Sequence, residues 1–279
     1  MSVFRELLLK DYVTLAGTIT GTLAIVLALL GVFYGESSYI LFATFSWSVA
    51  MACDLFDGWV ARKLNQANKI GKEIDSLSDA VSFVVAPAMI ILCASLNGEF
   101  LTFPLPAESI IFGVLVFVFC GIIRLAWFNV EDKGEGYTGL VTPMSAGFLV
   151  AFFISHYHFN RLATAWPEYH ALFNPVGVFF GNTLSVTIYM IILGLLNLAP
   201  FLKYSGDMQK KRGTWVYILV ILGTFLAIMI LLAGIFTGLN TNIAIFIGHS
   251  FALFFLFCVI GYIAHGFITY LSLRRKGES

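Results

Sequence analysis

Long apolar stretches recur along this chain, and each is long enough to cross a lipid bilayer as a helix. A crossing needs about 20 consecutive, mainly apolar residues, and the sequence offers eight such stretches. They lie near residues 13–33, 39–61, 79–97, 108–129, 141–157, 176–200, 214–236 and 243–271. With 59% hydrophobic residues, the chain is too apolar to be a water-soluble domain. We therefore expect an integral membrane protein.

The bilayer also determines the class of fold. Backbone polar groups in hydrocarbon must be hydrogen-bonded within the protein, and continuous apolar segments of this length achieve that as helices. We predict an all-α, polytopic transmembrane helix bundle of about eight spans. The sequence contains no low-complexity tract or linker that would separate independent domains.

Basic residues are distributed asymmetrically between the loops of this predicted bundle. If both termini face the cytoplasm, 15 of the 16 Lys and Arg residues lie on the cytoplasmic side and only Arg161 lies outside. Cytoplasmic loops of membrane proteins carry an excess of Lys and Arg. We therefore expect an even number of spans with both termini in the cytoplasm.

Four aspartates lie at the cytoplasmic edge of the second and third apolar stretches. Asp54 and Asp57 are three residues apart, and Asp75 and Asp79 are four apart, so each pair shares one face of a helix. The segment between the pairs, RKLNQANKI, is polar and basic, and we expect a cytoplasmic turn there. Such a turn would bring the two acidic faces together.

Four carboxylates in one small volume repel one another unless they are protonated or neutralised. Ligands that offer only oxygen suit hard divalent cations. We expect the cluster to hold two such cations, Mg²⁺ or Mn²⁺, with Ca²⁺ as a further candidate. Paired metals of this kind serve phosphoryl chemistry, because they stabilise charge on a departing phosphate. An acid at the edge of the membrane indicates a functional site by default.

Small and basic residues accompany these aspartates. Gly58, Ala61 and Gly71 lie on the acidic faces, where they would let a nucleotide approach the backbone. The cations near the turn are Arg62, Lys63, Lys69 and Lys72, all potential donors to phosphate. Taken singly, the small residues also fit close helix packing, and the cations also fit topology and lipid contact.

The combined spacing Asp54-x2-Asp57-Gly58-x2-Ala61-Arg62-x8-Gly71-x3-Asp75-x3-Asp79 resembles the signature of the CDP-alcohol phosphotransferase family. The resemblance covers roughly residues 1–205 and implies a six-span membrane domain, with residues 206–279 as a two-span extension of the same bundle. It implies transfer of a phosphatidyl-type group from a CDP-linked lipid to a small alcohol, with release of CMP.

The resemblance also implies roles for individual residues. The four aspartates would hold two metals on the diphosphate, and Asp79 would also take the proton from the attacking hydroxyl. The CDP-lipid contacts would be Gly58, Ala61, Arg62 and Gly71, with Lys72 beside them. The lipid would be CDP-diacylglycerol or the ether lipid CDP-archaeol.

The acceptor alcohol is suggested by the fourth span. RLAWFNV at Arg124–Val130, GYTGLVTPMSAG at Gly136–Gly147 and DSLSDAVSFVVAPA after Gly71 are similar to the serine-transferring members of the family. We expect L-serine as the acceptor, with Arg124 pairing with its carboxylate and Phe128 and Asn129 shaping the pocket. Inositol phosphate, glycerol phosphate or choline is the alternative.

Two positions depart from the family pattern. Trp127 stands where a second Arg is usual, and Gly17 stands where many relatives carry Asn. The first departure removes one expected cationic contact to the acceptor or the lipid phosphate. Arg124 alone also fits a boundary arginine that reaches toward the interface.

Two other functions share part of this pattern. An intramembrane prenyltransferase also places paired Asp motifs at helix ends, but it lacks the Gly-x2-Ala-Arg element and the fixed spacer. A cation transporter would need acids deeper in the bundle. We expect an active site at the cytoplasmic interface, contact with membrane lipids, and no nucleic-acid partner.

Two weaker signals concern the external side. His156, His158 and His170 fall in a segment that we predict to be an interfacial loop rather than a zinc site. GVFFG at Gly177–Gly181 offers a small-xxx-small contact, so we expect a homodimer.

Overall fold

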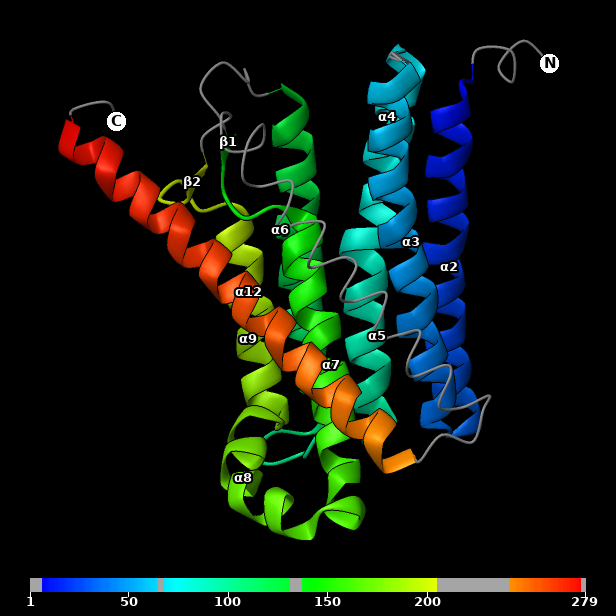
Figure 1. Cartoon of the computed structure of the whole chain (residues 1–279), viewed down its shortest axis with the longest axis vertical. Helices are drawn as coiled ribbons and strands as arrows, with labels where there is room; N and C mark the ends of the chain where they lie inside the picture. The colour runs from blue at the N-terminus through cyan, green and yellow to red at the C-terminus, as the bar shows by residue number, and fades with distance from the viewer. Residues whose placement is uncertain (1–6, 65–67, 131–136, 205–240, 277–279) are drawn as a thin grey trace.

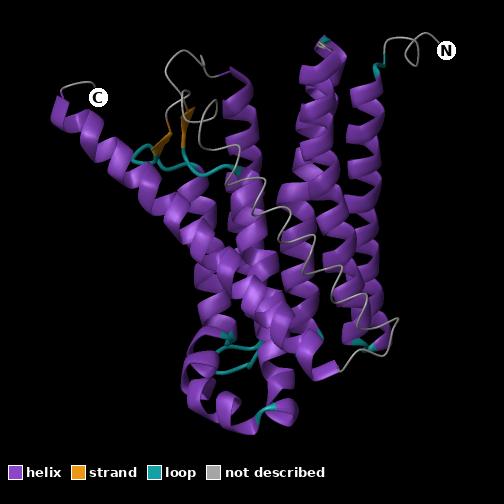
Figure 2. Cartoon of the chain, viewed as in Figure 1, coloured by secondary structure: helices purple, strands orange, loops and turns teal. Residues whose placement is uncertain are grey.

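The computed structural model describes residues 7–64, 68–130, 137–204 and 241–276. Its described residues form a bundle of long helices with one two-stranded ribbon (Figures 1 and 2). The helices are α2 (Leu9–Tyr34), α3 (Ser37–Leu64), α4 (Lys69–Asp79), α5 (Ala86–Leu96), α6 (Ile110–Val130), α7 (Thr142–Ala165), α8 (Pro167–Phe180), α9 (Thr183–Asn197) and α12 (Thr241–Lys276). The predicted class, a helical and polytopic membrane protein, is confirmed.

Five of the described helical segments are long and apolar enough to cross a membrane. They are Leu9–Tyr34, Ser37–Leu64, Lys69–Leu96, Ala107–Val130 and Ile245–Arg275, close to five of the predicted stretches. The predicted span 214–236 lies outside the described residues. The total of eight spans and the side on which the termini lie therefore stay predictions, as does the division at residue 205.

The predicted span 176–200 is wrong as a single helix. α8 ends at Phe180 and α9 begins at Thr183, so α9 is 15 residues long. Asn182 causes the break because its side chain accepts a hydrogen bond from Ser185 N at 2.9 Å and begins a new helix. Gly181 lies at this break, and a side chain would not fit there because the position of a β-carbon is already filled by His156.

The predicted external loop after residue 156 is also wrong. α7 continues as a helix to Ala165, and α8 follows after Trp166. His158, Phe159 and Leu162 are buried on this extension. The segment is therefore helical rather than a loop, and the end of α7 packs against the bundle through these buried side chains.

Small residues on α2 set the close packing of the first three spans. Gly17, Gly21, Ala24 and Ala28 recur at helical spacing, and all four are buried. A β-carbon on Gly17 would lie 3.1 Å from the β-carbon of Cys53, and one on Gly21 would lie 2.6 Å from Ser82 Oγ. Gly17 therefore sits against α3 with little room for a side chain.

The third span contains a π-helix, η1 (Ala80–Val85), directly after Asp79. In this segment the Ala86 N–H donates to the Val81 carbonyl instead of to the Ser82 carbonyl, its partner in a regular α-helix. Trp47 on α3 supplies the missing donor, because its indole Nε1 lies 2.7 Å from Ser82 O. A side chain of α3 therefore satisfies the buried carbonyl of the π-helix, as buried backbone groups require a hydrogen-bond partner.

We expect Trp47→Phe to destabilise the protein by about 1–3 kcal/mol, because the buried Ser82 carbonyl would lose its donor. Thermal unfolding in detergent measures this effect. Trp59→Phe is the matched control, since Trp59 is 51% exposed on the same helix. Equal melting temperatures for the two variants would contradict the role given to Trp47.

The functional end of the bundle is defined by where the elements begin and end (Figure 1). The first residues of α2 and α4 and the last residues of α3, α6 and α12 all lie at one end of the molecule. The ribbon of β1 (Tyr137–Thr138) and β2 (Lys203–Tyr204) lies there too, with Tyr137 opposite Tyr204. α8 lies at the opposite end.

Candidate active site

Three of the four predicted metal-binding aspartates come together between α3 and α4. Asp54, Asp57 and Asp75 each offer a carboxylate oxygen, and these oxygens all lie within 4.8 Å of one another. Asp57 is buried, while the other two are partly exposed. The cluster forms because the third span begins only a few residues after α3 ends and turns back through the bundle, with η1 and α5 packed against α3 and α4 packed against α2.

Asp79 lies one helical turn beyond Asp75 on α4. It is not part of the group of three, but its carboxylate interacts electrostatically with those of Asp54, Asp75 and Asp57. The structure therefore brings four acids into one electrostatic cluster, with three close enough to share an ion. Hard oxygen donors gathered at this spacing fit a divalent cation.

Thr14 on α2 contacts the cluster directly, and the sequence analysis did not identify it. Its hydroxyl donates to Asp57 Oδ2 at 2.6 Å in a buried position. This hydrogen bond holds one carboxylate oxygen, so the orientation of Asp57 is fixed by the first span. The available signal was a polar residue within the first apolar stretch, at the end that faces the aspartates.

Asp11 is a second residue that the sequence analysis missed. It is fully buried. Its carboxylate accepts hydrogen bonds from Leu8 N at 2.8 Å and Lys10 Nζ at 2.7 Å, and a third from Asn68 Nδ2 at 3.1 Å. Asn68 is the N-cap of α4, and its Oδ1 accepts a hydrogen bond from Gly71 N at 3.1 Å. Asp11 therefore ties the start of α2 to the start of α4, which fixes the helix that carries Asp75 and Asp79.

The two glycines of the signature have different surroundings. A β-carbon on Gly58 would meet only Arg62 Nη1, at 3.5 Å, whereas one on Gly71 would collide with Asn68, Asp11 and Lys10. Close packing at the start of α4 therefore accounts for Gly71. Gly58 and the partly exposed Ala61 border accessible space. The CDP-lipid contacts of these residues stay predictions.

The predicted phosphate donors lie on the surface beside the cluster. Arg62, Lys63 and Lys72 are exposed, and Lys63 Nζ lies 4.6 Å from the ring centroid of Trp59. Lys72 Nζ donates to the backbone oxygen of Asn129 at 3.1 Å. Lys72 thus lies where α4 meets the end of α6.

The predicted acceptor residues lie at the same junction. Asn129 Nδ2 donates to Ser76 Oγ at 2.7 Å, and Ser76 is next to Asp75. Arg124 is buried on α6, with its guanidinium carbon 5.2 Å from the ring centroid of Phe128 and its Nε donating to Leu140 O at 3.4 Å. Trp127, by contrast, is 56% exposed. Asn129 therefore meets α4 next to Asp75, whereas Arg124 faces Phe128 and the Leu140 carbonyl.

The glycines of GVFFG face the interior of the chain. A β-carbon on Gly177 would collide with the ring of Phe159, and one on Gly181 would collide with His156. The contact predicted between two copies is thus used within one copy, and the motif does not support a homodimer. His156 Nε2 binds the Glu99 carbonyl at 3.0 Å, a structural role rather than a zinc site.

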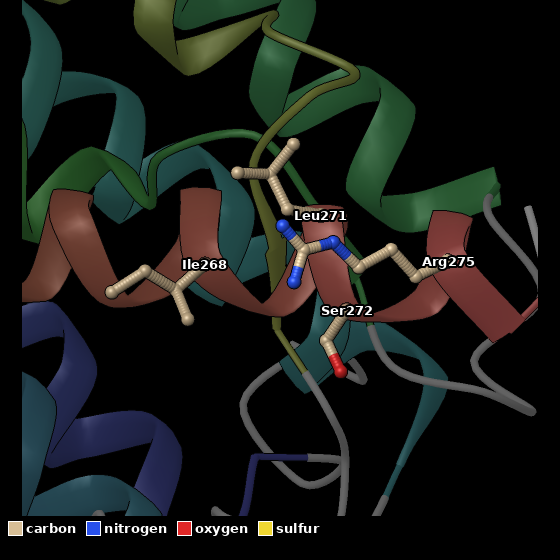
Figure 3. A pocket seen from close by; sticks show the side chains of 4 residues that line it. All are labelled: Ile268, Leu271, Ser272 and Arg275. Atoms are coloured by element: carbon tan, nitrogen blue, oxygen red, sulfur yellow. The ribbon is translucent and has the colours of Figure 1, made fainter.

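A surface hollow on α12 does not belong to the acidic cluster. It is lined by Ile268, Leu271, Ser272 and Arg275 (Figure 3), and α12 ends well apart from α3 and α4 (Figure 1). The hollow offers one cation and apolar walls, which suits contact with anionic lipid. It has no carboxylate for a metal.

The chain is similar in sequence to known proteins. The family model described as CDP-alcohol phosphatidyltransferase matches residues 7–181. Archaetidylserine synthase of Methanothermobacter thermautotrophicus is 33% identical over 161 residues, covering 57% of this chain and 62% of that protein. The CDP-diacylglycerol–serine O-phosphatidyltransferase of Methanocaldococcus jannaschii is 32% identical over 163 residues, covering 58% and 69%. The Saccharomyces cerevisiae protein of the same name is 37% identical over 159 residues, covering 53% and 54%.

Proposed function

Because the chain belongs to the CDP-alcohol phosphatidyltransferase family, we propose that it transfers a phosphatidyl-type group from a CDP-linked lipid to L-serine and releases CMP. The observation that carries this proposal is the group formed by Asp54, Asp57 and Asp75 between α3 and α4. The choice of serine is supported by the names of the relatives, two of which are serine O-phosphatidyltransferases. The matched region covers 54% to 69% of the three relatives.

The acidic cluster would hold two divalent cations, Mg²⁺ or Mn²⁺, with Asp54, Asp57, Asp75 and Asp79 as ligands. When bound, these cations would offset the charge of the diphosphate and of the departing CMP. Thr14 keeps Asp57 oriented through the 2.6 Å hydrogen bond to its Oδ2. Asp11 and Asn68 hold the start of α4, so the two pairs of acids keep their separation.

The CDP headgroup would lie along the side of α3 where Gly58 leaves space. Gly58 and Ala61 would admit the nucleotide to the backbone, and Arg62 and Lys72 would pair with its phosphates. Gly71 would act indirectly, by allowing the close packing that holds the start of α4. The acyl or ether chains would stay in the bilayer, since the cluster lies near the end of α3 at Leu64 and the start of α4 at Lys69. In this proposal that end faces the cytoplasm, in keeping with the excess of basic residues there.

Asp79 would accept the proton of the serine hydroxyl. The hydroxyl oxygen then forms a bond to the β-phosphorus of the CDP-lipid, the bond from that phosphorus to the oxygen of CMP breaks, and CMP leaves. Arg124 would pair with the serine carboxylate, and Phe128 and Asn129 would shape the pocket. The contact of Asn129 with Ser76, next to Asp75, supports placing the acceptor at this junction.

A panel of acceptors tests the proposal. We expect purified protein with Mg²⁺ or Mn²⁺ and either CDP-diacylglycerol or CDP-archaeol to release CMP at least about ten-fold faster with L-serine than with inositol phosphate, glycerol phosphate or choline. One buried Arg suited to a carboxylate gives a preference of this order, about 1.4 kcal/mol. Faster release with another alcohol would reassign the acceptor, and no acceptor-dependent release would refute the transferase activity.

A further inference from the structure

Three tyrosines from separate parts of the chain form one stack, here termed the tyrosine column: Tyr137 on β1, Tyr204 on β2 and Tyr262 on α12. The ring centroids of Tyr137 and Tyr204 lie 5.2 Å apart, and those of Tyr204 and Tyr262 lie 4.4 Å apart with planes 11° from parallel. The hydroxyl oxygens of Tyr137 and Tyr262 lie 2.6 Å apart. Stacking and hydrogen bonding therefore join α12 to both strands.

The tyrosine column reaches Arg124. The guanidinium carbon of Arg124 lies 6.0 Å from the ring centroid of Tyr137, within the range of a cation–π contact. Two residues after β1 begins, Gly139 takes a left-handed conformation with φ of 77°, and its N–H donates to Leu202 O at 2.9 Å. This turn presents the Leu140 carbonyl to Arg124 Nε. The position of β1 thus decides where the guanidinium lies.

Two glycines of α12 differ in their relation to the column. A β-carbon on Gly266 would lie 2.5 Å from Cζ and 2.6 Å from Oη of Tyr204, because the ring packs on the backbone of α12 at this point. A β-carbon on Gly261 would meet nothing within 4 Å. A methyl group at residue 266 therefore displaces the column, while the same change at residue 261 does not.

We propose that Tyr262 is a positioning residue for the acceptor: through Tyr204 and Tyr137 it holds Arg124 in the orientation that pairs with the carboxylate of serine. This inference rests on the proposed function. It gives a role to α12, which lies outside the matched residues 7–181. The column would set the affinity for the alcohol, whereas the CDP-lipid and its cations are held by α3 and α4.

Gly266→Ala and Gly261→Ala form the matched pair that tests this inference. For Gly266→Ala in the full chain, we expect the KM for L-serine to rise about three- to ten-fold, the range that corresponds to loss of one aromatic contact. The KM for the CDP-lipid should stay near wild type, while the melting temperature should fall, because the added methyl group overpacks the buried Tyr204 ring. Gly261→Ala should match wild type in all three values.

Substitution of Tyr262 separates the stack from the hydroxyl contact. Tyr262→Leu removes both and should raise the KM for serine as Gly266→Ala does, while Tyr262→Phe keeps the stack and should recover most of the affinity. Phe257→Leu, at a residue 69% exposed on α12, is the control for loss of an aromatic side chain.

The outcomes distinguish this inference from the proposed function. If wild-type protein uses serine but Gly266→Ala and Tyr262→Leu leave its KM unchanged, or raise the KM of the CDP-lipid equally, the inference is refuted and the transferase activity stands. If wild-type protein prefers another alcohol, the KM of that alcohol is measured in the same variants, and an unchanged value again refutes the inference. Wild-type protein that uses no alcohol refutes both.

Discussion

Replacing Asp79 by asparagine is expected to lower kcat by about 10²- to 10⁴-fold, the usual contribution of a positioned general base. The amide cannot accept the proton of the attacking hydroxyl. Asp54, Asp57 and Asp75, whose carboxylate oxygens lie within 4.8 Å of one another, remain in this variant. Binding of cation and CDP-lipid should therefore persist, and steady-state CMP release together with equilibrium binding of CDP-lipid measures the two effects.

Two comparison variants sharpen this prediction. Asp54→Asn removes a member of the group of three and should weaken binding of cation and CDP-lipid more than Asp79→Asn does. Glu73→Gln removes the same charge from an exposed residue of the same helix and should leave both properties unchanged. If Asp79→Asn and Asp54→Asn both kept near-normal rates, the roles given to these residues would be wrong.

Removal of divalent cations is expected to abolish CMP release completely, with recovery on addition of Mg²⁺ or Mn²⁺. Without cations, three close carboxylates repel one another and the CDP-lipid diphosphate. Cation binding should also stabilise the fold, by about 2.7 kcal/mol at a concentration 100 times the Kd. The melting temperature with and without EDTA gives a measure that does not depend on turnover.

Asp57→Asn provides the comparison for this stabilisation. The variant keeps the hydrogen-bond acceptor for Thr14 but loses one negative charge, so its melting temperature should respond less to Mg²⁺ than that of wild type. An equal response in both proteins would place the cation elsewhere. Activity that survives exhaustive chelation would contradict the proposed chemistry altogether.

The spacing of the aspartates allowed the central part of the site to be predicted. Helical periodicity placed Asp54 with Asp57 and Asp75 with Asp79, and the polar segment between them correctly predicted that the third span turns back toward α3. Periodicity describes one helix at a time, however. It could not show that Thr14 and Asp11 of α2 pack against this pair, because contacts between helices depend on side-chain shapes along the whole interface.

The errors have a common physical origin. Hydropathy merged α8 and α9 into one span because Gly181 and Asn182 interrupt an otherwise apolar run, and the capping hydrogen bond from Ser185 N to Asn182 decides the break. The homodimer stays a prediction, since the glycines of GVFFG pack onto Phe159 and His156 within one copy. Small residues in a helix indicate that another element packs closely against it, but they do not identify that element.

The π-helix that follows Asp79 limits which insertions and deletions the third span can accept. Its extra residue offsets the rotation of α4 relative to α5, and one residue corresponds to about 100° in an α-helix. Deleting one residue from Ala80–Val85 would let the segment return to regular α-helix, with the faces of α4 and α5 still in phase. A further inserted residue would instead rotate Asp75 and Asp79 by about 100° relative to α5 and move them away from α3. Insertions should therefore be selected against in this apolar stretch more strongly than loss of the one extra residue.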